Sequence, residues 1–260
     1  MSKKTTEGIK MKKKLEGQTF ISRSFRQVLP YALYDFIKCV RIAMKSKGPF
    51  YSQNNEDSIL LEYFPERKGT YIDIGSGNPK YLSNTYAFYK RGWDGYLFDP
   101  IKSNILASKI FRSRDVIKRN FVGTEHTEQM FFQLEPSYFS TSEPLVVEYW
   151  IAQGAQLVRQ YKTETISIKS LNFICRPSDP VFFSIDTEGS ELEVLKSIDF
   201  ERQLPRAIVL ETWDSDKVSN VSECTKILIK NGYGKISNNN ENDIWIHESY
   251  KMPKIQNAGS

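Results

Sequence analysis

Short apolar runs alternate with segments of helical spacing along most of the chain after residue 49. Runs of β-branched and apolar residues bounded by turn residues are typical of strands, whereas apolar residues recurring every three or four positions are typical of helices. The predicted strands are Thr70–Ile74, Tyr96–Phe98, Asp115–Lys118, Val181–Ile185 and Ala207–Leu210, and the predicted helices are Thr85–Arg91, Asn104–Phe111, Ser190–Ile198 and Val221–Asn231. Strands that alternate with helices pair in parallel, so the pattern predicts an α/β fold with a mostly parallel sheet covered on both faces.

The pattern changes in the middle of the chain and again near its end. Two strands, Met130–Leu134 and Thr165–Ile168, are predicted on either side of a helix over Val146–Tyr161. Farther on, Gly234–Ser237 and Asp243–His247 flank an Asn-rich turn. This last pair predicts an antiparallel hairpin at one edge of the sheet.

The N-terminal part of the chain has a different character. Apolar residues in Phe20–Met44 follow helical spacing, and Pro30 divides the segment into two short helices because its ring cannot continue the hydrogen-bond ladder. A Gly-Pro pair then interrupts the chain. We therefore predict a basic tail and helical segment in residues 1–48 and one folded domain over residues 49–260.

Charge is distributed unevenly between these two parts. Residues 1–48 hold 12 Lys and Arg against 3 Asp and Glu, whereas the remaining residues hold 24 against 28. A basic arm can attract nucleic acid, anionic lipid or a phosphorylated substrate, and it can equally be a solvated tail that leads into a helix. The helical part of this segment is expected to pack against the folded domain or against a second subunit in a homo-oligomer.

Composition argues against a membrane-spanning protein and against one stabilised by disulfides or zinc. Hydrophobic residues make up 40% of the chain, and no uninterrupted apolar stretch reaches the ~20 residues of a membrane-spanning helix. The N-terminus lacks an apolar run followed by a small-residue cleavage site, so we expect no secretory signal, and Cys39, Cys175 and Cys224 are odd in number and widely spaced. This pattern argues against a disulfide framework or a zinc cluster and favours a reducing, cytoplasmic setting.

A glycine turn follows the first predicted strand and is the first segment that indicates chemistry. Asp73 lies at the strand end, and Gly75 and Gly77 follow it. Glycines at this edge of a parallel sheet permit positive φ and let a ligand approach the main chain. The turn lacks the third glycine of the dinucleotide fingerprint and the Gly-Lys-Ser/Thr of a phosphate loop, so pyrophosphate binding fits poorly.

Asp99 provides an acidic side chain at the end of the next strand, 26 residues after Asp73. A carboxylate in this position can accept hydrogen bonds from ribose hydroxyls. The alternative is that Asp99 caps the helix that follows Pro100. Its pairing with the glycine turn favours the ribose role.

Several segments, taken in order, resemble the FkbM-type methyltransferases. The similarity lies in Tyr71–Pro79, Ser83–Tyr86, Gly92–Gly95 followed by Phe98–Pro100, and Phe183–Leu195 with its Asp-x-Glu-Gly-x-Glu pattern. Upstream, Ser52–Asp57 is similar to a Ser-Gln…Glu-Asp element in one branch of that family. The resemblance covers about residues 51–247.

The resemblance implies a Rossmann-like class I methyltransferase fold, with a mostly parallel seven-stranded sheet, an antiparallel edge hairpin and N-terminal helices. S-adenosylmethionine would bind over the first two strands, with its methionine end against Asp73 and the turn Gly75–Asn78, which includes Ser76 and Gly77. Asp99 would hold the ribose and Asn120 would lie near the adenine. The family's turn often reads Gly-Ala-Asn, so the extra glycine here shifts Asn78 by one position. Typical acceptors are hydroxyls on sugars or secondary metabolites.

Carboxylates that follow the fourth and fifth strands are the candidates for catalysis. Asp186, Glu188 and Glu211 should converge where the methyl donor binds, because their strands should neighbour the first one. An alcohol must lose its proton, either to a carboxylate or through a divalent metal that lowers its pKa. Asp186 and Glu211, with Asp214 or Glu188, are hard oxygen ligands suited to Mg²⁺ or Mn²⁺.

Other interpretations of these residues remain open. Asp186 could cap the following helix, with Glu188 in its first turn. If the carboxylates are not needed, His126 or Glu56 is the next candidate for the base. The aromatic residues of the middle segment are expected mostly in the core, and some of them could instead wall the acceptor site: Phe131, Phe132, Tyr138, Phe139, Tyr149 and Trp150.

Two other classes of enzyme share part of this pattern. A nucleic-acid methyltransferase is suggested by the basic N-terminus alone, because the chain lacks an Asn/Asp-Pro-Pro-Tyr/Phe segment and a catalytic Pro-Cys. A nicotinamide-dependent oxidoreductase would need the third glycine and a Tyr-x-x-x-Lys pair after a later strand. The sequence therefore favours an O-methyltransferase for a sugar or metabolite hydroxyl over an enzyme that acts on nucleic acid. The basic N-terminus is a candidate for peripheral membrane contact.

Overall fold

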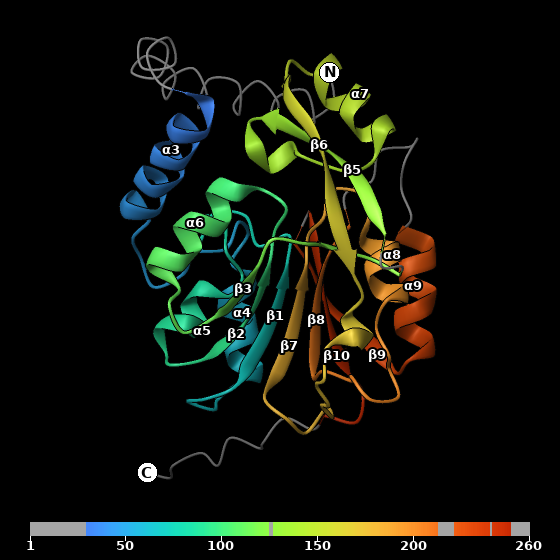
Figure 1. The fold of residues 1–260 in the computed structure, drawn as a ribbon. Coiled ribbons are helices and arrows are strands. Elements are labelled where there is room, and N and C mark those ends of the chain that lie inside the picture. The colour runs from blue at the N-terminus through green and yellow to red at the C-terminus, as the bar shows by residue number, and fades with distance from the viewer. Residues whose placement is uncertain (1–29, 125–126, 213–220, 240, 251–260) are drawn as a thin grey trace, which may run out of the picture.

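The computed structural model describes residues 30–124, 127–212, 221–239 and 241–250, and it contains two sheets (Figure 1). The larger is seven-stranded, in the order β3-β2-β1-β7-β8-β10-β9. Its strands are β1 (Thr70–Ile74), β2 (Asp94–Phe98), β3 (Val116–Lys118), β7 (Val181–Ile185), β8 (Ala207–Glu211), β9 (Tyr233–Asn239) and β10 (Asn242–His247). The direction of β10 is opposite to that of the other six strands, so it pairs antiparallel with both β8 and β9. The predicted parallel sheet and its edge hairpin are confirmed.

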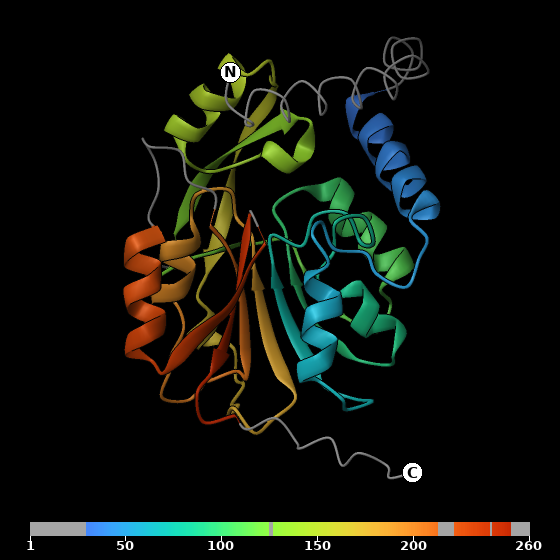
Figure 2. The same cartoon turned by 180° about the vertical axis from the view of Figure 1, so that it is seen from behind.

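Helices cover both faces of this sheet, and side chains that alternate along the strands form two separate cores. Ile72 of β1 packs toward α8 (Glu191–Lys196) and α9 (Val221–Lys230). Tyr71 packs on the opposite face toward α4 (Glu56–Tyr63) and α5 (Tyr86–Lys90), and Figure 2 brings α4 to the front of the sheet. Because β7 is buried along its whole length, its sequence is a nearly continuous apolar run.

A smaller sheet, in the order β4-β6-β5, lies beyond the carboxyl ends of the main parallel strands (Figure 1). Its strands are β4 (Phe121–Val122), β5 (Glu128–Glu135) and β6 (Gln156–Ile166), and α7 (Pro144–Ala152) joins the last two. We call β5, α7 and β6, with their connecting loops, the cap. The predicted helix over Val146–Tyr161 is wrong in its second half, because the chain turns at Gly154 (φ +97°) and continues as a strand paired with β5.

One helix precedes the main domain in the described part of the chain. It is α3 (Tyr31–Lys45), which begins just after Pro30 and packs against α6 (Lys102–Phe111). The first of the two helices predicted in Phe20–Met44 falls outside the described residues. None of the described helices is long and apolar enough to cross a membrane. The three cysteine side chains are buried and are not joined in disulfides.

Candidate functional site

The two glycines after β1 have different surroundings. Gly75 has φ +76°, and a Cβ atom there would lie 1.7 Å from the backbone oxygen of Asp186. Gly77 has φ +56°, and the nearest atom to a Cβ there would be 3.9 Å away. Gly75 therefore lets the ends of β1 and β7 meet, whereas Gly77 leaves open space in which a ligand can approach the main chain.

Asp99 connects this turn to the start of α6. Its carboxylate is 4% exposed and accepts hydrogen bonds from the backbone N–H of Gly77 (2.8 Å) and of Ile101 (2.7 Å), and from the Asn104 side chain (3.1 Å). Burial raises the pKa of Asp99 to about 7, and these hydrogen bonds oppose the rise. A carboxylate offers about four acceptor positions, so one remains for a ligand hydroxyl. The N-cap residue of α6 is Ile101, so the capping role predicted for Asp99 is wrong, and its ribose role stays a prediction.

Asp73 lies in a buried polar network beneath the turn. Strand alternation places its side chain on the same face as Tyr71, where the Thr85 hydroxyl donates a hydrogen bond to it. Arg112 donates to Thr85 (3.0 Å) and to Asp115 (2.7 Å). Burial raises the pKa of Asp73 to about 6, and the Arg112 charge opposes the rise. Asp73 thus supports the turn from below, and its contact with the cofactor stays a prediction.

The other predicted cofactor residues differ in their free hydrogen-bonding capacity. The Ser76 hydroxyl is buried and has no hydrogen-bond partner among the described residues. The Asn78 side chain donates to the backbone oxygen of Cys39 in α3 (2.9 Å) and accepts from the N–H of Lys80 and Tyr81. Asn120 is half-buried beside the smaller sheet. Ser76 is therefore the predicted residue whose side chain most needs a ligand partner.

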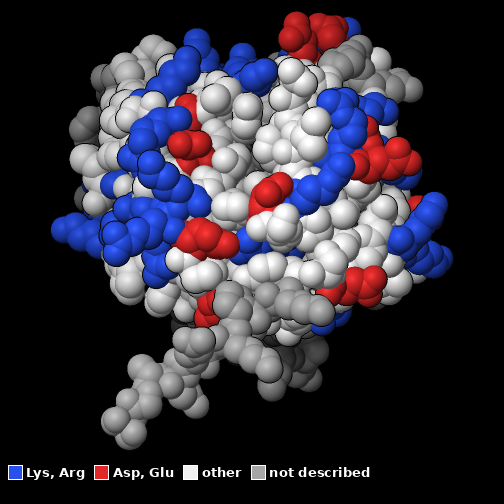
Figure 3. Space-filling view, turned by 90° about the horizontal axis from the view of Figure 1, so that it is seen from below, with Lys and Arg blue, Asp and Glu red and all other residues white. Residues whose placement is uncertain are grey.

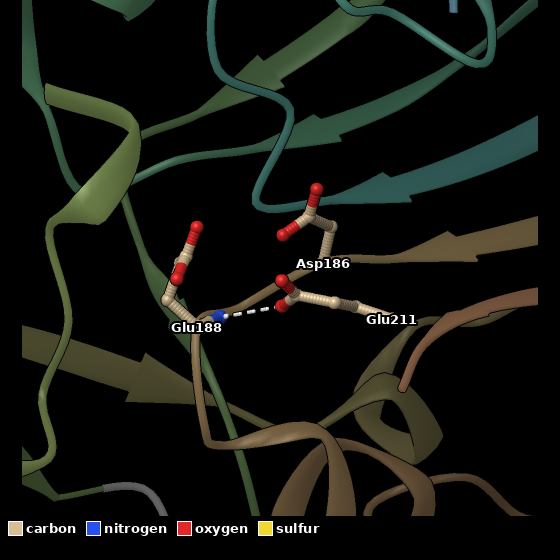
Figure 4. A group of neighbouring side chains, drawn as sticks. All are labelled: Asp186, Glu188 and Glu211. Atoms are coloured by element: carbon tan, nitrogen blue, oxygen red, sulfur yellow. Dashed lines mark hydrogen bonds between the residues drawn. The ribbon is translucent and has the colours of Figure 1, made fainter. Parts of the chain in front are cut away.

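The predicted carboxylates do meet at the carboxyl ends of β7 and β8. One oxygen from each of Asp186, Glu188 and Glu211 lies within 4.8 Å of the others, and Figure 4 shows the three side chains gathered there. The backbone N–H of Asp186 donates to Ile74 in β1 (3.0 Å), and that of Glu188 donates to Glu211 (3.2 Å). The neighbouring order β1-β7-β8 produces this arrangement. We call Asp186, Glu188 and Glu211 the carboxylate cluster.

Three negative charges in the carboxylate cluster are unfavourable, because the pKa values of all three side chains are raised. Burial raises the pKa of Asp186 to about 7, with the charge of Glu191 adding to the rise and a hydrogen bond shared with Glu211 opposing it. Burial and the charge of Asp186 also raise the pKa values of Glu188 and Glu211 above their ordinary range. The cluster therefore favours bound protons or a cation near neutral pH. Asp214, the fourth predicted ligand, lies outside the described residues.

Glu191 is a site residue that the sequence analysis missed. Its carboxylate accepts hydrogen bonds from the N–H (2.9 Å) and hydroxyl (2.8 Å) of Thr187 and from the N–H of Gly189 (3.1 Å). It thereby holds the loop on which Glu188 adopts φ +55°, a conformation that non-glycine residues rarely take. Ser190, and not Asp186, is the N-cap residue of α8. The position of Glu191 in the first turn of α8 could have indicated this role, because acidic residues are favourable at the start of a helix.

The cap supplies polar and aromatic side chains to the carboxylate cluster. The Thr141 hydroxyl donates to the backbone oxygen of Glu188 (2.7 Å), and the hydroxyls of Ser142 and Ser190 are 2.9 Å apart. Burial raises the pKa of Tyr138 to about 12, and the charge of Glu188 contributes. A hydrogen bond from Trp150 in α7 opposes the rise in the pKa of Glu188. Of the aromatics expected to wall an acceptor site, these are the two that interact with Glu188.

The alternative bases are placed differently. Glu56 accepts hydrogen bonds from the Asn54 N–H (2.8 Å) and from the Asn242 side chain (2.9 Å), so both of its oxygens are engaged. His247, the other histidine of the chain, ends β10, which lies between β8 and β9 in the sheet, and its ring contacts Tyr233. His126 lies outside the described residues. The geometry favours the carboxylate cluster over Glu56 and His247 for chemistry at the glycine turn.

Comparison with known families agrees with this geometry. Residues 73–233, more than half of the chain, match the family model described as the methyltransferase FkbM domain. The match begins at Asp73 and includes Asp99 and the whole carboxylate cluster. Among curated proteins, none matches the chain significantly.

Proposed function

The chain belongs to the FkbM family of S-adenosylmethionine-dependent methyltransferases, and from this premise we propose that it methylates a hydroxyl group. The carboxylate cluster beside the glycine turn is the observation that carries the proposal. It combines groups able to accept a proton near neutral pH with an open approach to the turn at Gly77. A hydroxyl is the acceptor that most needs such a group, because its unperturbed pKa lies far above neutrality.

The donor would bind over the carboxyl ends of β1 and β2. Gly75, Ser76 and Gly77 would line its methionine end, Asp99 would accept hydrogen bonds from the ribose, and Asn120 would lie near the adenine. The partnerless Ser76 hydroxyl, the open side of Gly77 and the remaining acceptor position of Asp99 support this assignment. When bound, the donor supplies a sulfonium methyl group. The chain's own contribution is to hold the acceptor oxygen in line with that methyl and to remove its proton.

Asp186 is the proposed general base. Its pKa near 7 suits a group that must be ionised before the reaction and protonated after it. The Asp186 carboxylate would take the hydroxyl proton as the acceptor oxygen receives the methyl group and the donor leaves as S-adenosylhomocysteine. Glu211, which shares a hydrogen bond with Asp186, would stabilise the ionised form when it is itself protonated.

A divalent cation is the alternative means of activating the hydroxyl. Asp186, Glu188 and Glu211 provide hard oxygen ligands close enough to share one ion, and Asp214 is a proposed fourth ligand. Mg²⁺ or Mn²⁺ would offset the burial and the repulsion that raise the pKa values of Glu188 and Glu211, and it would lower the pKa of a bound hydroxyl.

The acceptor we propose is a sugar, whether nucleotide-activated, part of an oligosaccharide or surface glycan, or attached to a metabolite. The electrostatic effect of Glu188 on Tyr138 and the hydrogen bond from Trp150 to Glu188 support an acceptor site with aromatic side chains near the carboxylate cluster. Binding sites for small molecules combine apolar and aromatic walls with a few placed polar groups. A sugar ring fits such a site, because it presents apolar C–H faces and hydroxyl edges.

The test is methyl transfer from a labelled donor to a panel of nucleotide-activated sugars and oligosaccharides. Asp186→Asn and Glu211→Gln should each reduce turnover by ~10²–10⁴-fold, the usual range for removing a general base. The exposed Glu201→Gln is the matched control and should keep full activity. Near-normal turnover by both cluster variants would contradict the proposal, and labelling of nucleic acid instead of sugars would favour the nucleic-acid alternative.

Chelation and pH separate the two versions of the mechanism. If a metal activates the hydroxyl, a chelator should abolish turnover, and Mg²⁺ or Mn²⁺ should restore it. If Asp186 acts without a metal, the chelator should have no effect. Turnover should then fall as the pH drops below about 7, because the base becomes protonated.

A further inference from the structure

Two adjacent helices leave large apolar side chains exposed. On α3 these are Leu33 (44% exposed), Ile37 (40%) and Met44 (54%), and on α6 they are Leu106 (37%) and Ile110 (58%). The helices pack side by side through their buried faces, with the Ser103 hydroxyl donating to Asp35 (2.6 Å) (Figure 1). We call the five exposed side chains and the exposed basic residues around them the α3–α6 surface.

The exposed charged residues of α3 and α6 are all basic. Arg41 and Lys45 are exposed on α3, and Lys102 and Lys109 are exposed on α6. Asp35 is the only acidic residue in either helix, and it is 3% exposed and bonded to its neighbours. By contrast, the face at the amino ends of the parallel strands carries acidic side chains among its basic ones (Figure 3).

The sequence that leads into α3 continues this charge. Residues 1–29 contain 8 Lys and Arg against 2 Asp and Glu. A polybasic segment next to an amphipathic helix is typical of proteins that bind anionic lipid, since each basic residue near such a surface contributes roughly 1 kcal/mol.

We propose that the α3–α6 surface docks the protein on an anionic lipid bilayer. Its apolar side chains would enter the boundary between headgroups and acyl chains, and its Lys and Arg side chains would contact the headgroups. Nucleic acid would use the positive charge but would leave the five apolar side chains in water. A symmetric dimer through this surface would place basic residues of one copy against those of the other. Anionic lipid uses both the charge and the apolar side chains.

Sedimentation of the full chain with vesicles tests the proposal. The chain should sediment with vesicles that contain phosphatidylglycerol in phosphatidylcholine and remain in solution with phosphatidylcholine alone. The double variants Ile37→Ser/Ile110→Ser and Arg41→Glu/Lys109→Glu should each reduce binding roughly tenfold or more, since they remove apolar burial and headgroup attraction respectively. Because the changed side chains are exposed, the variants should keep their melting temperatures.

Matched controls lie on α9, where Ile229 is 60% exposed and Lys226 is also exposed. Ile229→Ser and Lys226→Glu should bind vesicles like the unchanged chain. Equal sedimentation with neutral and anionic vesicles would overturn the proposal, as would unchanged binding by both α3–α6 variants. If Ile37→Ser/Ile110→Ser instead converted a dimer to a monomer in gel filtration, with no vesicle binding by the original chain, the surface would be a subunit interface and the proposal would be wrong.

Discussion

At the scale of single residues, Gly75 and Gly77 differ in what a side chain would meet. We expect Gly77→Ala to lower the free energy of unfolding by about 1–2 kcal/mol, because an L-residue at φ +56° is strained but has space. Gly75→Ala should cost more than about 3 kcal/mol, because its Cβ would overlap the backbone of Asp186 as well.

Urea unfolding of the two variants measures this difference. Each curve should keep its slope and shift its midpoint, with the larger shift for Gly75→Ala. Equal losses of stability in the two variants would mean that the contact between the ends of β1 and β7 is not what requires a glycine at position 75.

Several site residues could be predicted from the sequence because they lie at the ends of predicted strands. Asp99, Asp186 and Glu211 each follow or end an apolar run, and parallel strands bring such positions to one edge. The network of Asp73, Thr85 and Arg112 was not predictable in the same way. It depends on which side chains of separate elements meet beneath the turn.

At the scale of elements, α3 connects the glycine turn, α6 and the cap. Its Asp35 accepts hydrogen bonds from Ser103 in α6 (2.6 Å) and from Gln133 in β5 (3.0 Å), and all three side chains are buried. Its Lys38 forms an ion pair with Glu135 of the cap. The helix therefore fixes the position of the cap relative to the main sheet.

Asp35→Ala should lower the free energy of unfolding by about 1–3 kcal/mol, because it leaves the Ser103 and Gln133 donors without their acceptor. Lys47→Ala, which changes an exposed residue just beyond the helix, is the control and should have little effect. Denaturant unfolding gives both values. If Asp35→Ala proved no more destabilising than Lys47→Ala, the buried hydrogen bonds of α3 would not hold the cap.

The cap is also where the element prediction failed. The segment Val146–Tyr161 has apolar residues throughout, so periodicity alone did not separate the helix α7 from the strand β6. Gly154 marks the boundary, since glycine commonly ends a helix in the left-handed conformation. The long antiparallel pairing of β6 with β5 is a tertiary contact that local propensity does not reveal.

At the scale of the whole molecule, the seven-stranded sheet presents the glycine turn, Asp99 and the carboxylate cluster at one edge, and the cap lies beyond that edge (Figure 1). We propose donor binding at the turn and Asp99, and acceptor chemistry at the carboxylate cluster. These two functions should therefore be separable by mutation.

Calorimetric titration with S-adenosylhomocysteine tests this separation most directly. Asp99→Ala should weaken binding by about 1–3 kcal/mol, the scale of losing charge-assisted hydrogen bonds. Ser76→Ala should weaken it without loss of thermal stability, since its hydroxyl has no partner in the described part of the chain. Asp186→Asn and the exposed control Asp94→Ala should bind like the unchanged chain. Undiminished binding by both Asp99→Ala and Ser76→Ala, or its loss in a folded Asp186→Asn protein, would contradict the account.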